Sequence, residues 1–553
     1  MDDARPPRYR TETSVPEAWD LEADVVVVGF GAAGACAALE AAGAGADVLV
    51  LDRFSGGGAT ALSGGIVYAG GGTIQQLQAG VQDTPEAMFS YLSVEVGDAV
   101  TPATLRDFCN GSAAMMAWLS SKGVPFRGSL CPDKTSYPTN RYYLYYSGSE
   151  RSFAHLAPPA PRGHRAVGSG TSGRVFFAQL AAAVGSAGVR VIPQTRAEHL
   201  ITGADGQVTG VECLSTRNAP VWARLAHRVL HKVGKKPFLY AGSLGRRMHQ
   251  PVALLESRYA RPLRVGARNG VVISAGGFVA NRALLREHAP AYRGGLALGT
   301  VADDGSGMRL GAAAGGATKF LDRVSCWRFI TPPPAFLSGL LVDRSGQRVC
   351  DESLYGAAIG EAMVRRHDRR AWLLLDQAAV ARSWRQLRGS AQWFQLLQAL
   401  YLLTRARVSG PTLAKVAAKA GIDAVGLEAT VAAYNAAAGN PDPAGKPADL
   451  VTALDRPPYS LIDLSIRPRP AYPAPMLTLG GLVVAEDTGQ VRRADGTGIK
   501  GLYAAGRSAV GLCSRSYVSG LSLADCVYSG RRAGRHAAAA PALPAERASS
   551  YQY

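Results

Sequence analysis

The sequence Asp24-Val25-Val26-Val27-Val28-Gly29-Phe30-Gly31-Ala32-Ala33-Gly34 joins a β-branched run to the pattern G-x-G-x-x-G. Such a valine run is typical of a strand buried on both faces of a parallel sheet. An alanine-rich segment, 35–42, then favours a helix, and a second apolar strand at 47–51 ends at Asp52. We therefore predict a βαβ unit that binds a dinucleotide, the alternative being an ordinary glycine-rich turn from strand to helix.

Each glycine of this pattern has its own physical role. Gly29 permits the tight turn out of the strand, and Gly31 lets a pyrophosphate approach the backbone. Gly34 lets helix and strand pack closely. Ala32 and Ala33 begin the predicted helix, whose N-terminal N–H groups favour an anion. Asp52 is expected to accept a hydrogen bond from a ribose hydroxyl.

Composition restricts the other classes of function. The 553 residues suffice for two or three domains, and the formal charge of +18 suits an anionic partner. The sequence has no nucleic-acid-binding motif, so we predict no nucleic-acid partner. No apolar run is long enough to span a membrane. Its eight cysteines include no C-x-x-C pair, which predicts neither a metal site nor a disulfide framework. The polar segment 1–20 is no signal peptide, so we predict a cytoplasmic protein.

A second glycine-rich stretch, Ser55-Gly56-Gly57-Gly58-Ala59-Thr60-Ala61-Leu62-Ser63-Gly64-Gly65, follows Asp52. Together, "VVVVGFGAAG…LVLDR" and "GGATALSGG" resemble the superfamily of FAD-dependent fumarate reductases and 3-ketosteroid dehydrogenases. The resemblance implies FAD as the cofactor. It also assigns a set of cofactor-binding residues beyond the first motif: Arg53, Gly58, Ala59, Thr60, Ser63, Gly64, Gly65, Ala275, Gly276, Gly506, Arg507, Gly520, Ser522 and Leu523.

The same resemblance implies the fold and its division into domains. We expect an α/β protein with a Rossmann-like FAD-binding domain of the glutathione-reductase type and an inserted α+β substrate or cap domain. The predicted boundaries are 1–294 for the first part of the FAD-binding domain, 295–455 for the cap domain, and 456–553 for the second part with the C-terminal tail. A helix is expected to begin at 519–522, with its positive end towards the flavin.

The segment Tyr517-Val518-Ser519-Gly520 resembles the 3-ketosteroid Δ4-(5α)-dehydrogenases. This implies desaturation of steroid ring A, by abstraction of the proton beside the ketone and hydride transfer to flavin N5. Tyr517 is the candidate base, assisted by Ser519. Because a free tyrosine titrates near pH 10, this role requires a lowered pKa, towards which the helix N-terminus and a positive site would contribute.

The family also needs a catalytic acid, often a tyrosine of the central domain. The corresponding region, 322–331, contains Trp327 and Phe329 but no tyrosine. Tyr145, Tyr146 and Tyr355 are the alternatives, and Tyr146 is the residue that we select.

Residues 217–268 interrupt the alternating pattern with a strongly basic insertion whose only acidic residue is Glu256. The apolar residues Trp222, Leu225, Ala226, Val229, Leu230 and Val233 recur at helical spacing. Basic residues occupy the opposite face: Arg224, Arg228, His231, Lys232 and Lys235. Such a helix can lie on an anionic membrane, here the inner face; a solvated or subunit-contacting insertion is the alternative.

Three functions follow from these observations. The first is a dehydrogenase of a steroid-like hydrophobic ketone that passes its electrons to an external acceptor. The second is a fumarate-reductase-like reductase of a conjugated acid or enone, against which the absence of a His/Arg carboxylate clamp counts. The third is a catalytically silent flavoprotein recruited to membranes.

Overall fold

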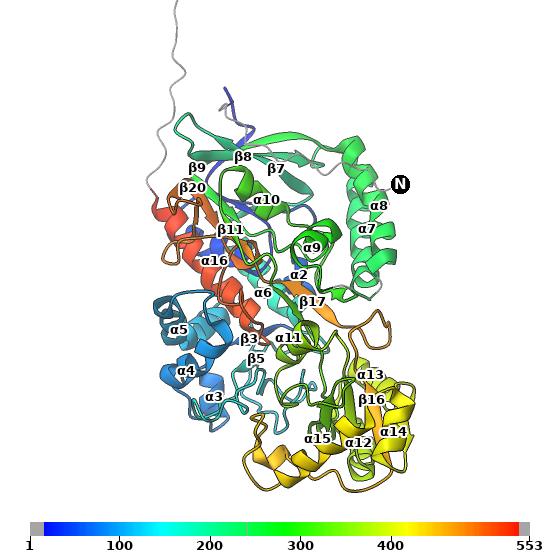
Figure 1. Ribbon diagram of the computed structural model, residues 1–553. Coiled ribbons are helices and arrows are strands. Elements are labelled where there is room, and N and C mark those ends of the chain that lie inside the picture. Colours follow the sequence, from blue (N-terminus) through cyan, green and yellow to red (C-terminus); the bar gives the residue numbers. More distant parts are fainter. Residues whose placement is uncertain (1–15, 241, 293, 541–553) are drawn as a thin grey trace, which may run out of the picture.

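The computed structural model describes residues 16–240, 242–292 and 294–540 (Figure 1). The first residues and the C-terminal tail included in the predicted domains, 1–15 and 541–553, lie outside the described residues. The predicted βαβ unit is present as β1 (Leu21–Val28), α1 (Ala32–Gly43) and β2 (Val48–Leu51). The strands β1 and β2 are parallel, with Val25 opposite Val48 and Val28 opposite Leu51. All four valines are buried, as the uninterrupted apolar run predicts.

The main sheet is built from segments far apart in the sequence. Its central path runs β19 (Gln490–Arg492), β20 (Gly498–Ala504), β9 (Arg261–Ile273), β1, β2 and β6 (Arg190–Ile192). Strand β9 is parallel to both β1 and β20, so it joins the two ends of the chain in one sheet. The hairpin of β7 (Thr195–Thr202) and β8 (Val208–Ser215) extends the sheet through β9.

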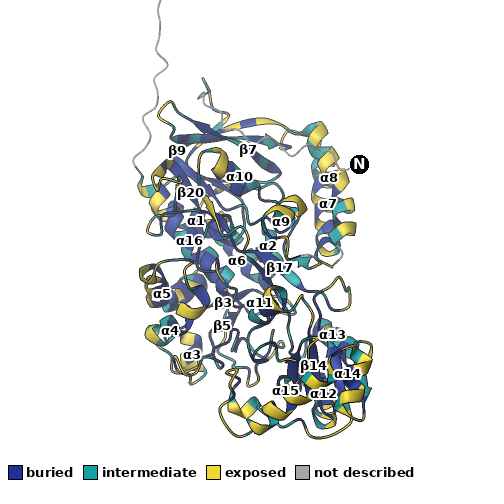
Figure 2. Cartoon of the chain, in the orientation of Figure 1, coloured by how far each residue is buried: buried dark blue, intermediate teal, exposed yellow. Residues whose placement is uncertain are grey.

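Helix α16 (Leu521–Ala539) packs against α1 (Figure 2). Glycines make this approach close. A Cβ atom on Gly530 would lie 2.4 Å from the carbonyl oxygen of Ala33, and one on Gly534 would lie 2.2 Å from that of Ala37. The C-terminal segment is therefore fixed directly onto the first helix of the nucleotide-binding unit.

The inserted domain has a sheet of its own, drawn in the lower part of Figure 1. Its antiparallel strands follow the order β13 (Leu340–Val342), β14 (Trp372–Leu375), β16 (Tyr459–Asp463) and β15 (Arg407–Gly410). Its helices are α11 (Gly356–Arg366), α12 (Gln377–Ser390), α13 (Trp393–Thr404), α14 (Leu413–Ala420) and α15 (Ala424–Ala436). The Rossmann-like domain with an inserted α+β cap domain is thus confirmed, whereas the domain boundaries stay a prediction.

The remaining elements connect these parts. A small sheet of β10 (Leu296–Ala297), β17 (Pro475–Thr478) and β12 (Val324–Cys326) lies between the two domains. The helices α4 (Pro85–Val96) and α5 (Pro102–Ser121) begin after the capping residues Thr84 and Thr101. The other elements are α2 (Gly58–Leu62), β3 (Ile66–Tyr68), α3 (Ile74–Gln78), β4 (Leu144–Tyr145), β5 (Gly163–Arg165), α6 (Gly173–Ser186), α9 (Arg282–His288), α10 (Ser306–Ala313), β11 (Thr318–Lys319), β18 (Gly481–Leu482) and the 3₁₀ helices Pro334–Ser338, Ala448–Leu450 and Gly506–Ser508.

Most of the predicted basic insertion, 217–268, forms an antiparallel pair of helices, α7 (Val221–Tyr240) and α8 (Gly242–Tyr259), which we call the helical hairpin. The predicted end of the insertion is wrong, because the residues from Arg261 on pair with β8 as part of β9. It lies at the side of the molecule in Figure 1. Among the described residues, no helix has both the length and the apolar content that crossing a bilayer requires.

The close approach of α16 to α1 gives a first prediction. Gly534→Ala places a methyl group against backbone and should destabilise the protein by about 1–3 kcal/mol, which lowers the melting temperature. The control is Gly111→Ala, in the exposed middle of α5, where a Cβ meets no atom within 4 Å. That change should raise stability by about 1 kcal/mol through helix propensity. Equal melting temperatures for the two variants would contradict the assignment.

Candidate active site

One continuous cavity, with about 2090 Å³ of empty space including its open mouth, lies between the main sheet and the inserted domain. It is reached by the residues that follow the carboxyl ends of three neighbouring strands: Gly29 after β1, Asp52 after β2 and Ser274 after β9. The carboxyl ends of parallel strands are where open α/β sheets bind their ligands.

Most of the site residues predicted from the sequence line this cavity. They are Gly29, Gly31, Ala32, Ala33, Asp52, Gly58, Ala59, Thr60, Ser63, Gly64, Ala275, Gly276, Arg507, Tyr517, Ser519, Gly520, Ser522 and Leu523. The predicted residues that do not line it are Gly34, Arg53, Gly65, Gly506 and Tyr146.

The non-lining glycines shape the backbone around the cavity. A Cβ on Gly34 would lie 1.9 Å from the carbonyl oxygen of Gly29, so this position serves helix–strand packing, as its place in the motif predicts. Gly65 and Gly506 have φ angles of +67° and +59°, which favour glycine.

The surroundings of Gly31 fit a phosphate group. A Cβ built there would meet only the Oγ1 of Thr60, at 3.5 Å, although Gly31 is the N-cap residue of α1 and lines the cavity. Protein packing therefore does not explain the glycine, and the free space lies at a helix N-terminus, where an anion is favoured. Thr60 Oγ1 also accepts a hydrogen bond from the N–H of Ala32, at 3.0 Å.

Asp52 has an additional structural role. Its carboxylate accepts hydrogen bonds from the N–H groups of Phe30, Phe54 and Gly56, at 2.9, 2.8 and 3.1 Å. A carboxylate offers about four lone-pair sites, so acceptor capacity for a ribose hydroxyl remains. Asp52 thus ties the glycine motif to the loop after β2 and still fits the nucleotide.

Arg507 provides a further sign of a ligand. Its guanidinium pairs with Asp303 at 2.5 Å, and both residues line the cavity. Within the described residues, its Nη1 is buried without a hydrogen-bond partner. Because an unpaired buried donor is costly, this atom is suited to an oxygen or nitrogen acceptor of a bound cofactor such as the flavin.

Hydroxyl groups gather at the N-terminus of α16. Tyr145 and Ser519 are hydrogen-bonded, with 3.2 Å between the phenol oxygen and Oγ. Tyr355 also lines the cavity, with its ring centroid 6.1 Å from that of Tyr517 and its phenol near Ser519. Tyr517 lies against the ring of Trp327, with 4.7 Å between ring centroids and an interplanar angle of 30°.

The expected lowering of the pKa of Tyr517 is wrong for the described protein. Burial raises the pKa of Tyr517 well above its usual value, and the N–H of Gly520 and the charge of Arg507 only partly oppose this. Burial also raises the pKa values of Tyr145 and Tyr355. At neutral pH these phenols are therefore protonated hydrogen-bond donors.

Tyr146 does not line the cavity, whereas Tyr355 does. Sequence reasoning considered Tyr355 without selecting it, because no local pattern links the start of α11 to Ser519. The cavity wall also contains aromatic residues that the sequence did not assign: Phe329, Phe394 and Tyr472. The sequence signal for this apolar wall is the pair of aromatic residues Trp327 and Phe329 in the segment 322–331.

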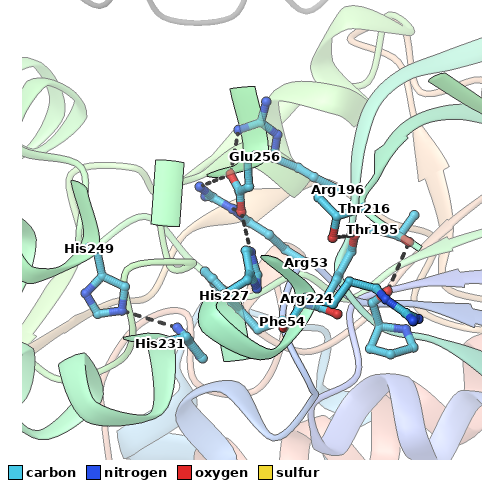
Figure 3. Close-up of polar contacts among 12 residues, drawn as sticks. Arg53, Phe54, Thr195, Arg196, Thr216, Arg224, His227, His231, His249 and Glu256 are labelled. Carbon is cyan, nitrogen blue, oxygen red and sulfur yellow. Dashed lines mark hydrogen bonds and ion pairs between the residues drawn. The ribbon is translucent and has the colours of Figure 1, made fainter. Parts of the chain in front are cut away.

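The helical hairpin contributes to the same cavity, because Leu239 and Tyr240 at the end of α7 line it. The contacts that seat the hairpin are drawn in Figure 3. Arg53 donates two hydrogen bonds to Glu256, at 3.0 and 2.9 Å, and His227 is 3.1 Å from the same carboxylate. Although burial raises the pKa of Glu256, His227 and Arg53 together lower it to about 2.

The second contact that seats the hairpin is a ring stack. His231 of α7 lies on Phe54, with 3.5 Å between ring centroids and an interplanar angle of 3°. Burial, together with the nearby Lys235, lowers the pKa of His231 to about 2. The ring is therefore neutral and suited to lie on an apolar side chain.

Comparison with known proteins is consistent with this site. The family described as FAD binding domain matches residues 24–520. The 3-oxo-5-alpha-steroid 4-dehydrogenase of Comamonas testosteroni is 38% identical over 503 residues, covering 88% of this chain and 93% of that protein. A probable fumarate reductase of Shewanella frigidimarina is 24% identical, covering 93% of this chain and 74% of that protein.

A solved structure is similar over nearly the whole chain. It is the 3-ketosteroid-delta4-(5alpha)-dehydrogenase of Rhodococcus jostii RHA1 in complex with 4-androstene-3,17-dione. Its TM-score is 0.80 at 31% identity, and the match covers 96% of this chain and 99% of that one.

The glycine-rich turn after β1 and Asp52, which we call the nucleotide cradle, define together with the cavity a flavoprotein oxidoreductase with FAD as its cofactor. The chain belongs to the FAD binding domain family, within the superfamily of fumarate reductases and 3-ketosteroid dehydrogenases.

The space beside Gly31 gives a second prediction. Gly31→Ala should weaken FAD binding by about tenfold or more, because the methyl group occupies the path of the pyrophosphate. The melting temperature of the apoprotein should not change, since the Cβ meets no backbone. Titration of apoprotein with FAD measures the affinity, and Gly43→Ala, whose Cβ meets no atom within 4 Å, is the control. An unchanged affinity would exclude the role given to Gly31.

Proposed function

We propose that this flavoenzyme is a 3-ketosteroid dehydrogenase that introduces a double bond beside the ketone in ring A, at the Δ4-(5α) position. The observation that carries the proposal is the placement of Tyr517, Ser519 and Tyr355 in one largely apolar cavity next to the FAD cradle. The Comamonas and Rhodococcus relatives, whose names state this activity, support it.

The chemistry requires removal of a proton beside the ketone and of a hydride from the neighbouring carbon. When bound, FAD supplies the hydride acceptor at N5. Ser519 Oγ would accept the proton from the carbon beside the ketone while it gives its own proton to a neighbouring phenol oxygen, such as that of Tyr145 at 3.2 Å, and that tyrosine in turn releases its proton to solvent. Because the phenols are protonated, Tyr517 is suited to donate a hydrogen bond to the ketone oxygen, which stabilises the developing enolate.

The reductase of a conjugated acid is the second candidate. It would require basic side chains that bind a carboxylate within the cavity. Arg507 is the one arginine or lysine among the described lining residues, and it is paired with Asp303. The lining is otherwise rich in aromatic and aliphatic side chains, which favours a fused-ring substrate over a small dicarboxylate.

Anaerobic reduction of the bound flavin tests the function directly. We expect a 5α-3-ketosteroid to bleach the flavin absorbance, and the reduced enzyme to be reoxidised by an artificial electron acceptor. Loss of reaction with every ketosteroid, together with oxidation of the reduced flavin by fumarate or an enone, would replace this proposal by the reductase. If the oxidised flavin reacts with no ketosteroid and the reduced flavin reacts with neither fumarate nor the enone, the silent flavoprotein is favoured.

Three variants test the site residues in the same assay. Tyr517→Phe, Ser519→Ala and Tyr355→Phe should each slow flavin reduction by about 10²–10⁴-fold, because each removes a hydroxyl that donates to or conducts a proton. The flavin should remain bound. Tyr528→Phe, on the helix α16 that follows Ser519 but hydrogen-bonded to Asp107 outside the cavity, is the matched control. If Tyr146→Phe, and not Tyr355→Phe, abolished the reaction, the assignment of Tyr355 would be wrong.

We further propose that the helical hairpin contacts an anionic membrane peripherally. The arrangement of α7 supports this. Its buried face carries Ala223, His227, His231, Gly234 and Phe238, whereas a stripe of larger apolar residues is directed to solvent. Trp222, Leu225, Val229 and Val233 keep 57, 55, 48 and 55% of their surface exposed.

Basic residues surround this apolar stripe. Arg228, Lys232 and Lys236 of α7 and Arg247 and Arg258 of α8 are exposed, and Figure 2 shows exposed residues along both helices. An apolar stripe with basic flanks matches the interface of an anionic bilayer. A second copy of this chain would bring the same positive charges together, so the bilayer is the favoured occupant.

Vesicle sedimentation tests the contact. The protein should co-sediment with phosphatidylcholine vesicles that contain about 30% phosphatidylglycerol, and less with phosphatidylcholine alone. The double variant Leu225→Asp/Val229→Asp should lose this binding. Val425→Asp, a change of a 76% exposed valine on α15, should retain it. Absence of vesicle binding, or light scattering that shows a dimer disrupted by the double variant, would contradict membrane contact.

A further inference from the structure

We infer that the helical hairpin is a substrate-loading surface, which takes the hydrophobic substrate from the membrane and passes it to the cavity beside Tyr240. The inference rests on the proposed ketosteroid dehydrogenase function, and it joins the exposed apolar stripe of α7 to the active site.

Tyr240 belongs to both the surface and the cavity. It is the last residue of α7, it lines the cavity, and it keeps 59% of its surface exposed. Of the other described lining residues, only Thr171 is exposed, so Tyr240 marks a place where the cavity reaches the surface. The stripe of α7 thus ends at an opening of the cavity.

The apolar surface continues across the cavity on α13. Phe394 and Gln398 of this helix line the cavity, while their neighbours Trp393 and Leu397 are 66% and 60% exposed. Trp393 lies edge-on to Phe394, with 5.9 Å between ring centroids. Figure 1 draws α7 and α13 on the same side of the molecule, above and below β17. Exposed apolar side chains therefore lie beside the cavity on both domains.

The hairpin is held in this orientation by its polar face. Glu256 of α8 pairs with Arg53 and contacts His227 (Figure 3). Together with the stack of His231 on Phe54, these contacts fix the hairpin to the loop after Asp52. The stripe is therefore exposed on a helix that is held firmly against the protein by its other face. Its inward face packs on α8, through Gly234 and Phe238, and on the loop after Asp52, which leaves the apolar face for an external partner.

Physical chemistry favours loading from a bilayer. A fused-ring ketone is concentrated in the hydrocarbon of a membrane, since each buried CH₂ group gains about 0.8 kcal/mol relative to water. An entrance placed at the membrane surface spares the substrate a passage through water. The basic flanks of the stripe hold the protein at that surface, and the aromatic residues at the opening suit the interface.

The test compares two sources of the same 5α-3-ketosteroid, offered to the holoenzyme and measured as flavin reduction. One source is phosphatidylcholine–phosphatidylglycerol vesicles that contain the steroid, and the other is a soluble cyclodextrin complex. The variants are Leu225→Asp/Val229→Asp, which do not line the cavity, and the control Val425→Asp.

We expect the double variant to lose about tenfold or more in kcat/KM with vesicle-held steroid, and to keep the wild-type value with the cyclodextrin complex. The control should match the wild type with both sources. Equal values for the double variant and the wild type with vesicles would overturn the loading role and leave the dehydrogenase intact. Failure of the wild type to reduce its flavin with the cyclodextrin complex would contradict the dehydrogenase and the loading role together.

Discussion

The close contact of α16 with α1 is the constraint on which the site depends. Gly530 and Gly534 let α16 lie directly on the backbone of α1, and α1 begins at the phosphate-binding turn. Since Ser519 and Gly520 immediately precede α16, this contact fixes the reactive hydroxyls relative to the nucleotide cradle. Strand β20 enters the same sheet through β9 and brings Arg507 to the cavity. The two ends of a long chain thus form one site because small residues permit a single close approach.

Sequence reasoning succeeded where function depends on local backbone geometry. The valine run, Gly29 and Gly34 have roles that short-range sterics determine, and the structure places them as the βαβ pattern predicts. The ribose contact of Asp52 stays a prediction, and its hydrogen bond to the N–H of Phe30 was not expected. Family resemblance extended this to the second glycine-rich loop and to α16. The Gly31 position is the clearest example, because its lack of a side chain has no explanation within the protein itself.

Sequence reasoning failed where a property depends on tertiary structure. The pKa of Tyr517 depends on how deeply the phenol is buried, and burial outweighs the helix N-terminus and Arg507 that a sequence can suggest. Tyr355 meets Ser519 only after the cap domain folds over the FAD-binding domain, so adjacent residues carry no signal of it. The pattern of α7 likewise predicts two faces but not their orientation. Paired with Phe54 and Glu256, the histidines turn inward and the apolar residues outward.

The way in which the helical hairpin leaves the sheet has an evolutionary consequence. Ser215 of β8 pairs with Arg261 of β9, so the insertion starts and ends at adjacent positions of an antiparallel ladder. A tight turn could replace it without changing the register of any strand. Loss or exchange of the hairpin would therefore leave the strand pairing intact and would change the part of the cavity wall that Leu239 and Tyr240 form.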